Sequence, residues 1–173
     1  GIDLDHRGRD QAEALAARFG PVRLAAIYSS PLERCVQTVE PLAAAKRLEV
    51  RASEALIEMD AGRWTNRTLA SLRRAREWKT VQRTPSQFRF PGGESFTEMQ
   101  GRMTTALDRL AAAHRGETVV AVSHADPIKA AVAQAMGTDL DLFQRIVLSP
   151  CSVTAIAYGD GTPVVLCVNS TGQ

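Results

Sequence analysis

Apolar and polar positions along the chain follow two kinds of pattern, short continuous apolar runs and longer stretches of helical period. The apolar runs predict buried strands, which lie at 24–29, 48–50, 118–122, 152–158 and 163–168. Apolar residues at every third or fourth position predict helices at 4–19, 31–46, 67–83 and 95–110, and a further helix that starts near Asp126. Strands that alternate with helices are typical of a parallel sheet in an α/β domain.

The run at 118–122 is the strongest strand signal, because it is apolar and rich in β-branched valine. Such a run predicts a central strand of the parallel sheet. The runs at 152–158 and 163–168 flank the turn at 159–161 and predict an antiparallel hairpin at the edge of the sheet.

Length and composition narrow the class of protein. The 173 residues predict a single domain, 1–173, with a buried core, and the net charge of +2 gives no indication of nucleic acid as a partner. The three cysteines, Cys35, Cys151 and Cys167, form no CxxC pair and predict core residues in a reducing, cytoplasmic compartment. No apolar stretch is long enough to cross a bilayer, so no membrane partner is expected.

The junction at 29–34 is the first candidate site. Ser30 can cap a helix that begins at Pro31, with Glu33 completing a capping box. The free N–H groups of such a helix would lie at the carboxyl end of the preceding strand, where open α/β sheets bind ligands and where helices attract anions. Arg34, in the first turn, can add a bidentate fork to a phosphate. The alternative is an ordinary strand-to-helix junction with a solvated arginine.

A second junction of this kind follows the strand at 118–122. His124 stands at the carboxyl end of that strand, with Ala125 and the start of the next helix directly after it. A single histidine is more often structural than catalytic, but this position makes it a candidate for chemistry. We expect Arg34 and His124 to meet at one crevice, because the carboxyl ends of parallel strands share one edge of the sheet.

Two carboxylates lie among apolar residues in the irregular segment 52–66. An apolar surrounding favours the acid form of Glu58 or Asp60, which suits a proton donor, while the alternative is a pair of loop carboxylates facing water. The predicted helix at 67–83 carries five basic residues, which form a solvated face or attract an anionic substrate. Ser95 and Glu98 predict a further capping box.

Cations, N–H groups and a proton donor near one crevice are the parts that phosphoryl transfer needs. The sequence has no Walker loop and no pair of histidines at metal-ligand spacing, so we expect neither a metal nor another cofactor. The expected partner is a small phosphorylated, anionic substrate.

Four motifs in order resemble the histidine phosphatase superfamily, which includes the phosphoglycerate mutases. They are Ser-Ser-Pro-x-x-Arg at 29–34, Glu-x-Asp-x-Gly-x-Trp at 58–64, Phe-Pro-Gly-Gly-Glu-Ser at 90–95 and Val-Ser-His at 122–124. The resemblance implies a three-layer α/β fold, with a mostly parallel sheet between helices and an antiparallel C-terminal hairpin.

The resemblance also implies roles for particular residues. Arg34 and His124 match the second arginine and second histidine of the family's phosphate pocket, and Glu58 matches its general acid. Ser30 and Ala125, beside them at the two strand ends, are expected to contact the substrate.

One family segment has no counterpart in the sequence. The family's nucleophilic histidine stands in a Leu-x-Arg-His-Gly segment at the end of the first, central strand, which is expected upstream of Gly1. Either the sequence is a fragment of a longer active protein, or it is a form without the nucleophile. We therefore expect a phosphomonoester hydrolase that works through a phosphohistidine. The alternatives are a 2,3-bisphosphoglycerate-dependent phosphoglycerate mutase, or a non-catalytic domain that binds phosphorylated ligands.

Overall fold

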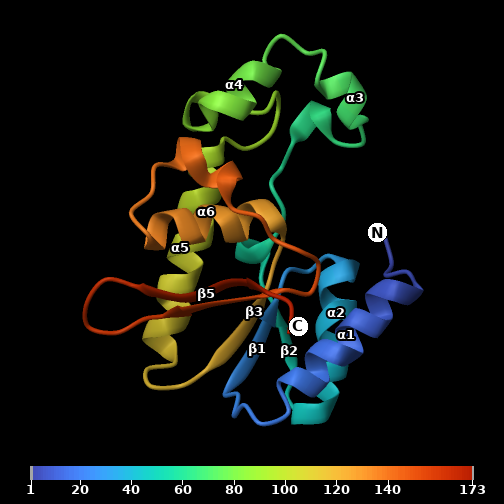
Figure 1. The fold of residues 1–173 in the computed structure, drawn as a ribbon, viewed down its shortest axis with the longest axis vertical. Coiled ribbons are helices and arrows are strands. Elements are labelled where there is room, and N and C mark those ends of the chain that lie inside the picture. The colour runs from blue at the N-terminus through green and yellow to red at the C-terminus, as the bar shows by residue number, and fades with distance from the viewer. Residues whose placement is uncertain (1, 173) are drawn as a thin grey trace.

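A computed structural model describes residues 2–172, which form a parallel sheet between two layers of helices (Figure 1). The strands are β1 Ala26–Ser29, β2 Val50–Ala52, β3 Val119–Val122, β4 Val153–Ala157 and β5 Val164–Ser170. The α-helices are α1 His6–Arg18, α2 Glu33–Lys46, α3 Leu69–Leu72, α4 Trp78–Arg83, α5 Phe96–Ala113 and α6 Ala125–Ala135. The 3-10 helices are η1 Glu54–Leu56, η2 Gly62–Trp64, η3 Pro85–Gln87 and η4 Leu140–Arg145.

The parallel sheet has the order β2-β1-β3, with Ile27 of β1 opposite Val50 and Val120. On one face, α1 and α2 pack against Ile27 through an apolar cluster that includes Val39 and Leu42. On the other face, α5 and α6 contribute Met103 and Ala131 to a cluster that packs with Tyr28 of the sheet. Successive residues of β1 therefore face opposite helical layers, as the strand geometry requires. The three-layer α/β fold is confirmed.

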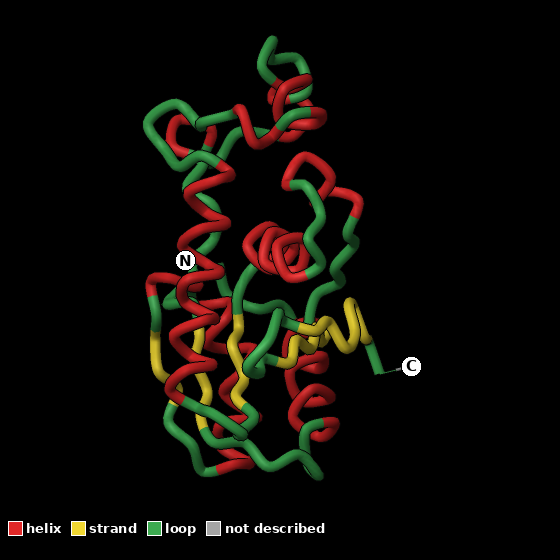
Figure 2. The backbone as a smooth tube through the Cα atoms, turned by 90° about the vertical axis from the view of Figure 1, so that its left-hand side faces the viewer, coloured by secondary structure: helices red, strands yellow, loops and turns green. Residues whose placement is uncertain are grey.

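The antiparallel hairpin predicted at the C-terminal end is also confirmed, as β4 and β5. These strands pair with each other and form a separate two-stranded sheet. Figure 2 shows the hairpin set apart from the three parallel strands. Arg18 of α1 fastens its end through hydrogen bonds to the carbonyl oxygen and hydroxyl of Ser170, at 2.7 and 2.5 Å.

The prediction that 118–122 forms a central strand differs from what the described residues show. Within residues 2–172, β3 pairs only with β1 and so lies at an edge of the sheet. All four of its residues are half-buried, although the run is apolar throughout. An edge position leaves one row of backbone groups without strand partners among the described residues.

The single basic helix predicted at 67–83 is instead two short helices, α3 and α4, separated by a turn. The apolar side chains of Leu72, Ala75 and Trp78 all pack against one aromatic cluster, so the chain bends around it. Packing outweighs helix propensity here, and the arginines three residues apart, at 73 and 76, repel each other on a continuous helix.

That aromatic cluster links the segment carrying α3 and α4 to the rest of the fold. Its rings come from Trp64, Phe88, Phe90, Phe96 and Phe143, with the Phe88 and Phe90 centroids 5.0 Å apart. Phe96 begins α5, whose N-terminus carries the predicted capping box of Ser95 and Glu98. As Figure 1 shows, this segment lies beyond the end of the sheet where β1 runs towards α2. It therefore stands over the carboxyl ends of the parallel strands.

No helix within residues 2–172 combines the length and the apolar character that a membrane span requires.

Candidate functional site

The carboxyl ends of β1 and β3 bring together the two junctions that the sequence singled out. The backbone N–H of Ser30 donates to the carbonyl oxygen of Val122 at 2.8 Å, which continues the pairing of the two strands past their ends. Arg34 Nη2 lies 3.0 Å from His124 Nδ1, and Ser30 Oγ lies 2.8 Å from His124 Nε2. The predicted meeting of Arg34 and His124 is confirmed.

The capping role predicted for Ser30 is wrong. Helix α2 begins at Glu33, and its N-cap is Leu32, which makes no side-chain cap hydrogen bond. The hydroxyl of Ser30 is fully buried and contacts the His124 ring instead. Ser30 Oγ also accepts from the backbone N–H of Leu32 at 3.4 Å, and the helix starts two residues later than the capping box predicts.

His124 is held as a neutral imidazole. Arginine can only donate hydrogen bonds, so His124 Nδ1 accepts from Arg34, and Nε2 carries the proton and donates to Ser30. Burial and, to a smaller extent, the positive charges of Arg34 and Arg102 together lower the pKa of His124 to about 4. At neutral pH the ring therefore offers one N–H donor, whose partner is a buried hydroxyl.

Glu58 faces the same ring from the segment that follows β2. Its Oε2 lies 3.8 Å from His124 Nδ1, and its Oε1 accepts a hydrogen bond of 2.9 Å from the backbone N–H of Met59. Burial raises the pKa of Glu58, and the charge of Asp126 adds to this effect, whereas the Met59 N–H opposes it. The acid form is favoured, as a proton donor requires.

Asp60, the other candidate acid, serves the backbone of its own turn. It is exposed, and its Oδ1 accepts from the backbone N–H of Gly62 at 2.9 Å. Its backbone pairs with Glu94 at 2.9 Å, so Asp60 closes a turn of the chain. Geometry therefore separates the two carboxylates that the sequence left as alternatives.

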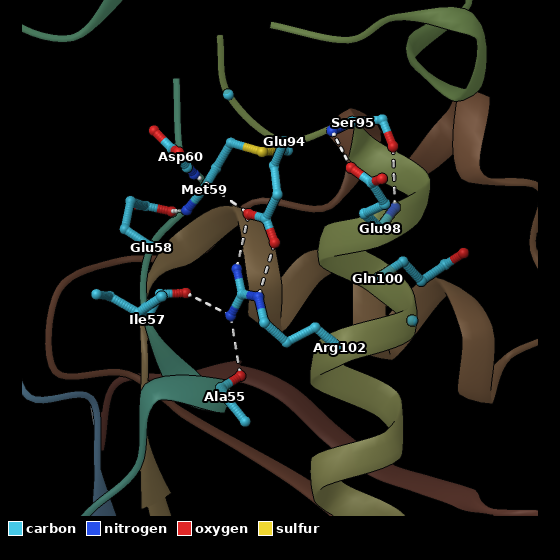
Figure 3. A network of polar contacts seen from close by, with 12 residues as sticks. Ala55, Ile57, Glu58, Met59, Asp60, Glu94, Ser95, Glu98, Gln100 and Arg102 are labelled. Atoms are coloured by element: carbon cyan, nitrogen blue, oxygen red, sulfur yellow. Dashed lines mark hydrogen bonds and ion pairs between the residues drawn. The ribbon is translucent and has the colours of Figure 1, made fainter. Parts of the chain in front are cut away.

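A half-buried arginine that the sequence analysis did not identify holds the Glu58 segment in place (Figure 3). Arg102 of α5 donates from Nη1 to the carbonyl oxygens of Ala55 and Ile57, at 2.9 and 3.0 Å. Its Nε and Nη2 bind both oxygens of Glu94, at 2.8 and 2.9 Å. The side chains of Arg102 and Glu94 are 21% and 19% exposed. We call these two residues and the carbonyls they fix the Arg102 clamp.

Close packing of backbone against backbone explains the glycines of the Phe-Pro-Gly-Gly-Glu-Ser motif. A Cβ on Gly93 would lie 2.3 Å from the carbonyl oxygen of Asp60, and one on Gly62 would lie 2.5 Å from that of Pro91. Gly62 also has a φ of +49°. The two segments approach so closely that both positions need glycine, and this contact places Glu94 opposite Arg102. The signal in the sequence for Arg102 was its position, directly before Met103 of the buried apolar stripe of α5.

Ala125 lies at the mouth of the site, as the first residue of α6. The first N–H groups of a helix have no intrahelical partners, so the start of α6 directs backbone donors and the positive end of its dipole at the crevice. Cys35 lies behind His124, with Sγ 3.5 Å from Nε2, and its thiol is buried with a raised pKa because of that burial. Ser30, Arg34 and Glu58 thus surround the ring of His124, and Ala125 follows His124 directly in the chain.

A cavity of about 430 Å³ opens beside Glu58, under the segment that carries α3 and α4. Lys129 and Asp126 of α6 also line it and form an ion pair of 3.3 Å. Among residues 2–172, no group of three or more His, Cys, Asp or Glu side chains is placed to hold a metal ion. Cations and N–H donors beside a carboxylic acid can bind a phosphate ester and protonate its leaving oxygen.

Comparison with known proteins agrees with this arrangement. The model of the histidine phosphatase superfamily (branch 1) matches residues 1–171. Phosphoserine phosphatase 1 of Hydrogenobacter thermophilus is 32% identical over 171 residues, which are 98% of this chain and 81% of that protein. A bifunctional protein of Mycobacterium tuberculosis is 35% identical over 165 residues, which are 91% of this chain and 43% of that protein.

A solved structure has the same fold. A mutant of the phosphoserine phosphatase of Entamoeba histolytica, in complex with phosphoserine, superimposes with a TM-score of 0.90 at 25% identity, covering 99% of this chain and 86% of that one. Because the family model matches nearly the whole length, this chain belongs to the histidine phosphatase superfamily (branch 1).

Proposed function

We propose that this protein hydrolyses small anionic phosphate monoesters through a phosphohistidine intermediate. The observation that carries the proposal is the convergence of three groups: Arg34 Nη2 lies 3.0 Å and Glu58 Oε2 lies 3.8 Å from the same nitrogen of His124. The family and the relatives named as phosphatases support hydrolysis of phosphate esters.

Four residues of the site are proposed to bind the phosphoryl group. Arg34 and the N–H of His124 bind oxygens of the phosphoryl group, and the helix start at Ala125 and the hydroxyl of Ser30 complete the set of donors. For His124 to donate to substrate, its Nε2–H turns from Ser30 Oγ to a phosphoryl oxygen. The charge that builds up on the oxygens is thereby balanced by groups already in place.

Glu58 acts on the leaving group. A histidine nitrogen attacks phosphorus, the bond from phosphorus to the ester oxygen breaks, and Glu58 gives its proton to that oxygen. In the second step Glu58 takes a proton from water as the water oxygen attacks phosphorus, the phosphorus–nitrogen bond breaks, and inorganic phosphate leaves. The raised pKa of Glu58 supports the first of these roles.

We place the attacking histidine upstream of Gly1, on a strand that pairs with the outer edge of β3. The apolar run at 118–122 and the half-buried state of all four β3 residues support a further strand beside it. Such a strand would run parallel to β3 and deliver its carboxyl end to the same crevice as Arg34 and His124. The three cysteines are free, which supports the cytoplasmic location we propose with it.

The test is release of inorganic phosphate from p-nitrophenyl phosphate by the full-length protein. We expect turnover, and we expect Arg34→Ala to abolish most of it. Arg115→Ala, at an exposed arginine in the turn after α5, should leave it unchanged. A coupled assay for interconversion of phosphoglycerates is run beside it. Efficient interconversion with little release of phosphate would establish the mutase instead, and phosphate binding without either reaction would establish a non-catalytic domain.

A further inference from the structure

The cavity beside Glu58 has walls of a different character from the phosphate site. Its side facing α3 and α4 is mostly apolar and includes Ala61, Trp64, Leu69, Leu72, Trp78 and Val81. The exposed amide of Gln82, on α4, is the polar group of that side. Figure 1 shows these helices standing over α6 at the end of the molecule. With a volume of about 430 Å³, the cavity is within the range of small-molecule sites.

The position of the cavity assigns it to the leaving group. Glu58, which is proposed to protonate the ester oxygen, is also part of the cavity lining. A phosphoryl group bound by Arg34 and His124 therefore directs its ester oxygen past Glu58 and into this space. The inference rests on the proposed function for that direction.

The two charged residues that α6 contributes to the cavity are paired with each other. Lys129 Nζ contacts Asp126 Oδ1 at 3.3 Å, and the Lys129 side chain is 19% exposed. Gln144 Nε2 is likewise taken, by the carbonyl oxygen of Val81 at 3.0 Å. A zwitterionic leaving group such as serine would bring its ammonium and carboxylate against walls made mostly of apolar side chains, with the Lys129–Asp126 ion pair already formed, which is costly. An apolar leaving group would instead displace water from apolar walls, which is favourable.

We propose that the preferred substrates are phosphomonoesters of alcohols with a bulky apolar body, aromatic or branched aliphatic, that fills the cavity between α6 and the helices α3 and α4. Leu69 is the residue that reports on this contact. It lines the cavity and is 52% exposed, so its substitution leaves the core intact. Leu166 of β5, 65% exposed and outside the cavity lining, provides a matched control.

Two pairs of ligands test the proposal on the full-length protein. Propyl and 3-phenylpropyl phosphate have leaving alcohols of nearly equal acidity, so the ratio of their kcat/KM values reports on the phenyl ring alone. We expect 3-phenylpropyl phosphate to be favoured by about tenfold or more over both propyl phosphate and O-phosphoserine. Leu69→Gln should lower the phenylpropyl-to-propyl ratio about threefold or more, and Leu166→Gln should leave it unchanged.

Calorimetric binding of the corresponding phosphonates, which cannot be hydrolysed, separates this proposal from the proposed function. Tighter binding of 3-phenylpropylphosphonate than of propylphosphonate, lost in Leu69→Gln, supports the apolar subsite even if no ester is turned over. Hydrolysis of the esters with equal kcat/KM values and equal phosphonate affinities would overturn it, as would a preference for O-phosphoserine. Equal effects of the two leucine substitutions would overturn it as well.

Discussion

The Arg102 clamp makes the sharpest prediction about stability, and the change that tests it is Arg102→Met. Methionine keeps much of the aliphatic stem but removes every donor, so the carbonyl oxygens of Ala55 and Ile57 and both oxygens of Glu94 lose a partner together. Breaking a buried ion pair from one side costs about 3–5 kcal/mol. Because Arg102 and Glu94 are 21% and 19% exposed rather than fully enclosed, we expect the lower end, about 3 kcal/mol.

The assay is urea unfolding of the full-length protein, read as a shift in midpoint at constant slope. Arg115→Met is the matched control, because Arg115 pairs with Asp160 at 3.5 Å where the two side chains are 81% and 99% exposed. An exposed pair of this kind contributes about 0–1 kcal/mol, so the control should stay near the unmodified protein. An equal loss of unfolding free energy in both variants would refute the stabilising role of the Arg102 clamp, because the prediction is that Arg102→Met costs more than Arg115→Met.

Three further predictions concern the site itself. Arg34→Ala should weaken the binding of inorganic phosphate, measured by calorimetry, about tenfold or more, because a charge-assisted hydrogen bond is lost. It should also raise the pKa of His124, because the positive charge of Arg34 opposes protonation of the ring. An NMR titration of the histidine measures that pKa, and an unchanged value would contradict the contact. Glu58→Gln should slow esters of poor leaving groups far more than p-nitrophenyl phosphate, and equal slowing of both would argue against proton donation. The pKa of His124 is about 4 in the folded protein and 6.5 in the unfolded chain, so between these pH values the unfolded chain binds one more proton at this residue. The contribution of His124 to the free energy of unfolding is therefore lost as the pH falls from about 6.5 to about 4, by at most about 1.4 kcal/mol per pH unit. His124→Gln should flatten that part of the curve of unfolding free energy against pH, and an identical curve would contradict it.

Much of the fold follows from the sequence because its signals are local. The apolar runs at 24–29 and 118–122 form β1 and β3. Their carboxyl ends meet because paired parallel strands end at the same edge of the sheet. That meeting is what brought Arg34 within hydrogen-bonding distance of His124, although 90 positions separate them in the chain.

The parts that sequence reasoning missed depend on partners distant in the chain. Ser30 has every local feature of a helix cap, but a histidine from another strand occupies its hydroxyl. The segment 67–83 has helical period throughout, but it forms two helices, and its apolar residues Leu72, Ala75 and Trp78 pack against a cluster contributed largely by distant parts of the chain. The sequence analysis did not identify Arg102, because two of the groups it binds are backbone carbonyl oxygens, which no residue type at 55 or 57 indicates.

The proposed mechanism makes one product that no simple binding domain can make, a phosphorylated histidine. The most direct measurement is therefore 31P NMR, with peptide mass spectrometry, on the full-length protein quenched in alkali during turnover of a phosphomonoester. The account predicts a phosphoramidate signal on a histidine other than His124, and a longer-lived signal in Glu58→Gln, where activation of water is slowed. Phosphate release with no phosphohistidine at any quench time, or the label on His124 itself, would contradict it.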